Sequence, residues 1–131
     1  MVSKLRLPAK PLTLADVGEM IEWWHIKFGL EQWTVKVCTA ALDGAAMRTT
    51  REVPYREAMV RVDPKVYNLA ASEVQRLACH EMLHLAIAPL TDQQVQFFGE
   101  GVVRKALEGA EETAVDGLTS VLVRLIKPPK G

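Results

Sequence analysis

Two histidines separated by three residues, in the segment His80-Glu81-Met82-Leu83-His84, restrict the structure of this chain more than any other feature. Residues four apart lie on one face of an α-helix, so a helix here would bring both imidazoles within reach of a single metal ion. Glu81 follows the first histidine and would lie near enough to hold or deprotonate a water bound to that metal. We therefore predict a helix that carries a metal site, with the other elements packed around it.

The sequence around the motif predicts where this helix begins and ends. Ser72 and Gln75 are spaced as a capping box at its start. Pro89 is predicted to stop it, with Ala88 as the last helical residue. Apolar residues lie on two sides of the expected helix, which is typical of a helix buried between layers.

Three short segments with alternating apolar and polar residues predict β-strands: Trp33–Thr39, Met47–Val53 and Glu57–Val62. Turn residues separate them, at Asp43-Gly44 and at Pro54-Tyr55. Because the strands follow one another with short connections, we expect a small, mainly antiparallel three-stranded sheet.

Further helices are expected on both sides of these segments. The first should span about residues 14–28, with Thr13 as N-cap, Asp16 three residues later and Gly29 at its end. A short helix is expected near 92–98. The last helix should begin near Val102, more surely at Ala110, and end before Pro128. The predicted fold class is α+β, with residues 1–131 forming a single domain.

Composition narrows the class of protein. The 16 basic and 16 acidic residues cancel, which argues against a nucleic-acid partner. No apolar run is long enough for a membrane span, and no signal-peptide pattern is present. We therefore expect a cytoplasmic protein that does not bind a membrane. Cys38 and Cys79 are expected to be buried thiols, and His25 a packing histidine rather than a ligand.

A catalytic zinc site usually has three protein ligands and a water, so a third ligand is needed. Six carboxylates downstream of the motif are candidates: Asp92, Glu100, Glu108, Glu111, Glu112 and Asp116. A ligand should lie on a rigid element beside the apolar face that docks it on the core. Glu112 and Asp116 meet this condition and share one helix face, since they are four residues apart.

We therefore predict that Glu112 binds the metal and that Asp116 accepts the N–H of one ligand histidine. Glu108 shares the Glu112 face and is the reserve ligand. Glu111 should point about 100° away from Glu112, toward solvent. Alternatively, the glutamates form only a solvated charged face.

The motif His80-Glu81-Met82-Leu83-His84, followed by Glu112-Thr113-Ala114-Val115-Asp116, resembles the gluzincin class of zinc metallopeptidases. The order of elements is similar to the minimal cores of small bacterial and phage metallopeptidases. The resemblance implies a zincin-like fold, one Zn²⁺ held by His80, His84 and Glu112, and Glu81 as the general base of peptide hydrolysis.

The sequence departs from this class after the zinc glutamate, where larger members carry Tyr or His residues that stabilise the oxyanion. Tyr55 and Tyr67 precede the motif and are possible substitutes, although packing or rim positions suit them as well. Weak or highly selective activity is therefore expected, since one such donor is worth roughly a hundredfold in rate. A homodimer or another protein partner could complete the cleft.

The expected substrate is a peptide or protein. If the strand that ends at Val62 forms the sheet edge beside the cleft, an extended peptide could pair with its backbone as an added strand. Two alternatives stay open at this point. One is a zinc-binding regulatory or interaction module without turnover, and the other is a structural protein in which the motif arose by chance. Bound zinc would exclude the second alternative, and loss of cleavage on Glu81→Gln would exclude the first.

Overall fold

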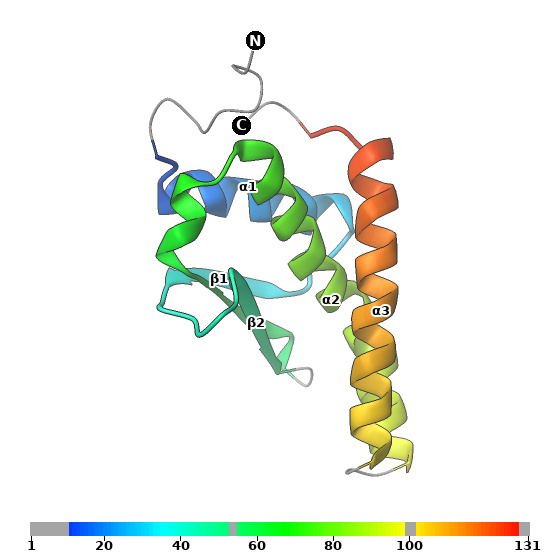
Figure 1. Ribbon diagram of the computed structural model, residues 1–131. Coiled ribbons are helices and arrows are strands. Elements are labelled where there is room, and N and C mark those ends of the chain that lie inside the picture. The colour runs from blue at the N-terminus through cyan, green and yellow to red at the C-terminus, as the bar shows by residue number, and fades with distance from the viewer. Residues whose placement is uncertain (1–10, 53–54, 99–101, 129–131) are drawn as a thin grey trace.

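The computed structural model describes residues 11–52, 55–98 and 102–128, and it confirms an α+β architecture (Figure 1). The elements follow in the order α1 (Leu14–Lys27), β1 (Thr34–Thr39), β2 (Met47–Glu52), β3 (Glu57–Val62), the short 3-10 helix η3 (Pro64–Asn68), α2 (Ala71–Phe98) and α3 (Val102–Leu125). Of the described helices, none is long and apolar enough to cross a bilayer.

The first helix begins as the sequence predicts. The Asp16 N–H donates to Thr13 Oγ1 at 3.1 Å, and the Thr13 N–H donates to Asp16 Oδ2 at 2.9 Å, which completes a capping box. Gly29 follows the helix with φ of 69°, a left-handed conformation that glycine adopts without a steric penalty. His25 contacts the carbonyl oxygens of Leu30 and Trp33 through Nε2, so it holds the turn into β1, a structural role.

The sheet is mixed rather than mainly antiparallel, and its strand order is β1-β3-β2. β3 lies in the centre, parallel to β1 and antiparallel to β2. The connection 40–46 is long enough to carry the chain from β1 past the end of β3. Asp63, just after β3, fixes this crossing, because its N–H donates to Ala46 O at 2.9 Å and its Oδ2 accepts the Leu42 N–H at 2.8 Å. The Lys65 N–H also donates to Asp63 Oδ1, at 3.0 Å, and the hydrogen bonds from Lys65 and Leu42 to this carboxylate lower the pKa of Asp63.

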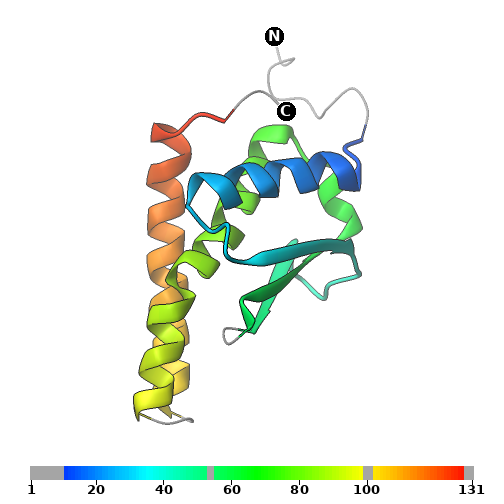
Figure 2. The same ribbon diagram turned by 180° about the vertical axis from the view of Figure 1, so that it is seen from behind.

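The motif helix α2 is longer than predicted, because it continues through Pro89 to Phe98. The expected stop at Ala88 and the separate helix at 92–98 are both wrong. A proline inside a helix removes one backbone hydrogen bond and clashes with the preceding turn. Here the far half of α2 runs beside α3, as both views show (Figures 1 and 2), so the helix continues beyond the proline alongside a second long helix. The helix begins at Ala71, so Ser72 lies within its first turn and is not the N-cap that the predicted capping box requires.

The core lies between one face of the sheet and the helices. Alternate residues of β3 are buried (Ala58, Val60 and Val62), so one face of the sheet is covered. α2 is central as predicted, since it packs against α1, α3 and β2 and is buried on two sides. Trp24 Nε1 of α1 donates to Gln75 Oε1 of α2 at 2.8 Å. The buried residues of α2 include Val74, Ala78, Cys79, Met82, Leu83 and Leu85.

Candidate metal centre

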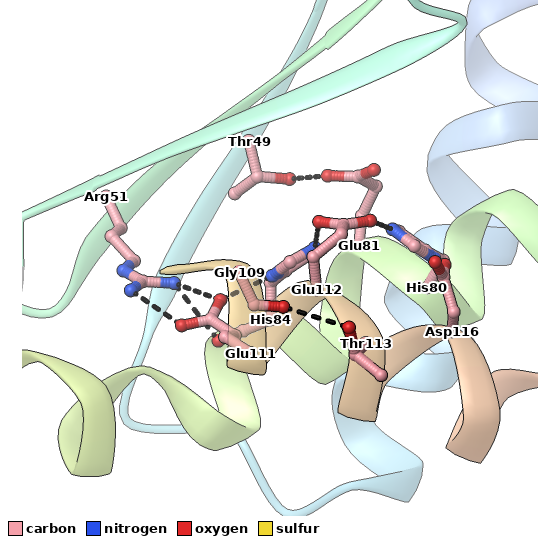
Figure 3. A network of polar contacts seen from close by, with 10 residues as sticks. All are labelled: Thr49, Arg51, His80, Glu81, His84, Gly109, Glu111, Glu112, Thr113 and Asp116. Carbon is pink, nitrogen blue, oxygen red and sulfur yellow. Dashed lines mark hydrogen bonds and ion pairs between the residues drawn. The ribbon is translucent and has the colours of Figure 1, made fainter. Parts of the chain in front are cut away.

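α2 and α3 bring the predicted ligand residues together (Figure 3). The imidazoles of His80 and His84 lie on one face of α2, with ring centroids 5.0 Å apart. Glu112 of α3 faces both rings, with Oε2 3.1 Å from His80 Nε2 and Oε1 3.1 Å from His84 Nε2. One ligand atom from each residue lies within 4.8 Å of the other two.

The other nitrogen of each imidazole faces a carboxylate. His80 Nδ1 lies 3.3 Å from Asp116 Oδ1, the contact predicted for this aspartate, and His84 Nδ1 contacts Glu111 Oε2. A carboxylate at Nδ1 favours the tautomer that has hydrogen there, which leaves the lone pair of Nε2 for a metal. Two Nε2 atoms and one carboxylate oxygen form a donor set that suits Zn²⁺, so the residues present fit this ion.

The prediction that Glu111 points to solvent is wrong. Its side chain is only 5% exposed, and it receives two hydrogen bonds from Arg51 of β2, from Nη1 at 3.0 Å and from Nη2 at 3.2 Å. Glu111 is buried because the face of α3 that packs on the core includes it together with Val115 and Thr119, each four residues further on. Thus Glu111 and Arg51 belong to the site, although the sequence analysis did not assign them to it.

Glu81 lies in the same cleft, buried beneath β2. Thr49 Oγ1 donates to Glu81 Oε1 at 2.6 Å, a contact that the sequence analysis also missed. Burial raises the pKa of Glu81, and the hydrogen bond from Thr49 and the nearby imidazoles oppose this only in part. A buried carboxyl with a raised pKa is suited to accept a proton near neutral pH.

The carboxylates around His84 change its protonation. Burial acts to lower the pKa of this histidine, but the hydrogen bond to Glu111 and the charges of Glu81, Glu111 and Glu112 outweigh it. The pKa of His84 is therefore raised above its ordinary value of 6.5. Such a shift, next to a cluster of donor atoms in a cleft, is typical of functional sites.

The cleft has a volume of about 570 Å³ and lies between β2 and the two long helices. The strand beside it is β2, because β3 is in the centre of the sheet. The expectation that the strand ending at Val62 forms the edge beside the cleft is therefore wrong. The residues that line the cleft are Met47, Arg48, Thr49, Arg51, His80, Glu81, His84, Glu108, Glu111 and Glu112.

The structure does not bring the two tyrosines to this cleft. Tyr55 is 72% exposed, and the Tyr67 hydroxyl shares a hydrogen bond with Thr39 Oγ1; neither lines the cleft. Glu108, the reserve ligand, lines the cleft but is not in the group of converging donor atoms. The Asp92 side chain and Glu100 lie outside the described part.

The two cysteines lie apart from the donor atoms. Cys79 is fully buried, and burial raises the pKa of its thiol to about 11, as expected for a structural cysteine. Cys38 is half-buried in β1, with its thiol 3.6 Å from Met59 Sδ of β3.

Comparisons with protein-family models, with curated proteins and with solved structures found no match. The zincin-like character of the fold and the likeness to gluzincins stay predictions.

Proposed function

We propose that the protein is a zinc-dependent metallopeptidase of low or highly selective activity. The observation that carries this proposal is the convergence of His80 Nε2, His84 Nε2 and a Glu112 carboxylate oxygen beside the buried carboxyl of Glu81. Zinc, when bound, would polarise the scissile carbonyl and lower the pKa of a bound water.

The side chains around this site have separate tasks in the proposed reaction. Glu81 accepts the proton of the attacking water and passes it to the leaving amine. Thr49 holds the Glu81 carboxylate by its 2.6 Å hydrogen bond. The backbone of β2 along the cleft pairs with an extended peptide, which presents the peptide bond to the donor atoms.

The test combines metal analysis with cleavage of a peptide library. The purified protein is expected to bind one zinc ion, and His80→Ala and Glu112→Gln should each remove it. Glu81→Gln should keep the zinc and lose cleavage. Glu73→Gln is the matched control, because Glu73 is exposed on the same helix, two turns before the motif. Cleavage by the Glu81→Gln variant at the parent rate would overturn the assigned role of Glu81.

A second candidate function is a zinc-binding regulatory or interaction module without turnover. It is favoured by one observation, that neither Tyr55 nor Tyr67 lines the cleft as an oxyanion donor. Zinc bound by a fourth protein ligand, with no cleavage in the library, would support it. For either function, we also propose that a second copy of the chain or another protein completes the cleft. The proposed location is the cytoplasm.

A further inference from the structure

One cation joins the three elements that surround the proposed metal site. The guanidinium of Arg51, on β2, donates to both carboxylate oxygens of Glu111 on α3. Its Nη1 also lies 3.3 Å from the backbone carbonyl oxygen of His84 on α2. The side chains of Arg51 and Glu111 are only 19% and 5% exposed, so water screens this contact little.

This arrangement fixes the plane of the Glu111 carboxylate. A guanidinium that donates two parallel hydrogen bonds holds a carboxylate in one orientation. The Oε2 atom that accepts from Arg51 Nη1 is the same atom that contacts His84 Nδ1. The imidazole of His84 is therefore oriented by a carboxylate that is itself held from β2.

We propose that Arg51 is a positioning residue for the metal: through Glu111 it fixes the ring orientation and the Nδ1–H tautomer of His84, so that Nε2 faces the Glu112 carboxylate. This inference rests on the proposed function. It extends the site beyond the ligands to β2, the strand that borders the cleft.

The sign of the effect separates positioning from simple electrostatics. A positive charge beside a cation site repels the cation, so removal of Arg51 should strengthen zinc binding if charge alone matters. If Arg51 acts by positioning, its removal should weaken zinc binding, by about tenfold from the usual effect of residues that orient metal ligands.

The experiment measures zinc affinity by competition with a chelating dye for Arg51→Met, Arg51→Lys and Arg48→Met. Arg51→Met is expected to bind zinc about tenfold more weakly than the parent, and Arg51→Lys should lie between the two. Arg48→Met is the matched control, because it removes an arginine that is exposed, lines the same cleft and lies on the same strand. It should bind zinc as tightly as the parent or slightly more tightly. Equal or tighter binding by Arg51→Met would overturn the proposal.

Two further measurements show whether Arg51 acts through Glu111. The double variant Arg51→Met/Glu111→Ala should bind zinc no more weakly than Glu111→Ala alone. An additional tenfold loss of zinc affinity would overturn the proposal that Arg51 acts through Glu111.

The second measurement is made on the metal-free protein labelled with ¹⁵N-histidine. Neutral His84 should be the Nδ1–H tautomer, and Arg51→Met should give a mixture of the two tautomers. Unchanged tautomer populations would also overturn it. Because this readout needs no metal, it still decides the role of Arg51 if the parent protein binds no zinc and the proposed function fails. If Arg51→Met does not fold, Arg51→Lys, which retains the charge, replaces it in both measurements.

Discussion

His80 and His84 are equivalent in the sequence motif, but the structure holds them in different ways. Each has a carboxylate of α3 at Nδ1. The carboxylate at His80, from Asp116, is 63% exposed and lies 3.3 Å away. The carboxylate at His84, from Glu111, is 5% exposed and is bound by Arg51.

This difference shows which half of the site is organised before a metal binds. An exposed ion pair contributes little free energy, because water competes for both partners. Removal of one partner of a buried pair is costly, because it leaves a charge without compensation. We therefore expect the fold to hold the His84 ring more tightly than the His80 ring before a metal binds.

The largest expected effect is on zinc affinity, and it should differ between variants of the two carboxylates. Glu111→Ala should weaken zinc binding by about 100-fold and Asp116→Ala by about tenfold or less, within the range for residues that orient metal ligands. Competition with a chelating dye measures both. Equal losses would show that the two histidines are held alike, whatever the burial of their partners.

The next prediction concerns the stability of the metal-free protein. Arg51→Met should lower the free energy of unfolding by about 2–3 kcal/mol, because it removes the guanidinium that donates two hydrogen bonds to the buried Glu111 carboxylate. Asp116→Asn should change it by less than about 0.5 kcal/mol, as is usual at exposed positions. Urea unfolding followed by circular dichroism gives both values, and a larger loss for Asp116→Asn would reverse the comparison.

The third prediction is a pH dependence that originates at His84. The folded protein holds the proton of this imidazole more tightly than the unfolded chain does, since its pKa is raised above 6.5. The resulting stability is fully present below 6.5 and is lost as the pH rises through the folded pKa. The melting temperature in the presence of a chelator should therefore fall over this interval. In Glu111→Gln the melting temperature should depend less on pH over this interval. Asp116→Asn, which alters the carboxylate partner of His80, is the control and should keep the pH dependence of the parent.

The smallest expected effect tests Thr49, which supports Glu81 from the same strand as Arg51. Thr49→Val keeps the shape of the side chain and removes its 2.6 Å hydrogen bond. The free energy of unfolding should fall by about 1 kcal/mol, the usual value of one hydrogen bond. Zinc affinity should stay within about twofold of the parent, because Thr49 Oγ1 donates to Glu81, which is not a proposed ligand. A tenfold loss would show that Thr49 also positions the metal ligands.

The motif helix and the strands could be predicted because local rules determine them. The bounds of β3 agree with the sequence prediction, and those of β1 and β2 differ from it by one residue. His80 and His84 could be placed together because residues four apart lie on one helix face, and the same spacing relates Glu112 to Asp116 on the last helix. The order of the strands could not be predicted, because the chain crosses β3 between β1 and β2, and contacts of Asp63 that are distant in sequence fix this crossing.

The position of Glu111 was missed for a different reason. Helix periodicity gives the angle between residues, but not which sector of the helix meets the core. On α3 the apolar residues Leu118 and Leu125 are 44% and 73% exposed, so hydrophobicity alone does not identify the face of this helix that meets the core. The spacing of Glu111 from the buried Val115 was a usable signal, but the cation that pairs with Glu111, Arg51, lies 60 residues earlier in the sequence.

The edge position of β2 has a consequence for solubility. Among the described strands, β2 pairs only with β3, so its other edge can pair with any extended chain, including a second copy of the protein. The sequence Met47-Arg48-Thr49-Thr50-Arg51-Glu52 places three charged residues in this six-residue strand. Charged side chains such as the exposed Arg48 and Glu52 on an edge strand oppose uncontrolled sheet growth, because a chain that pairs there would have to displace their hydration water. The strand beside the cleft thus carries its own protection against aggregation.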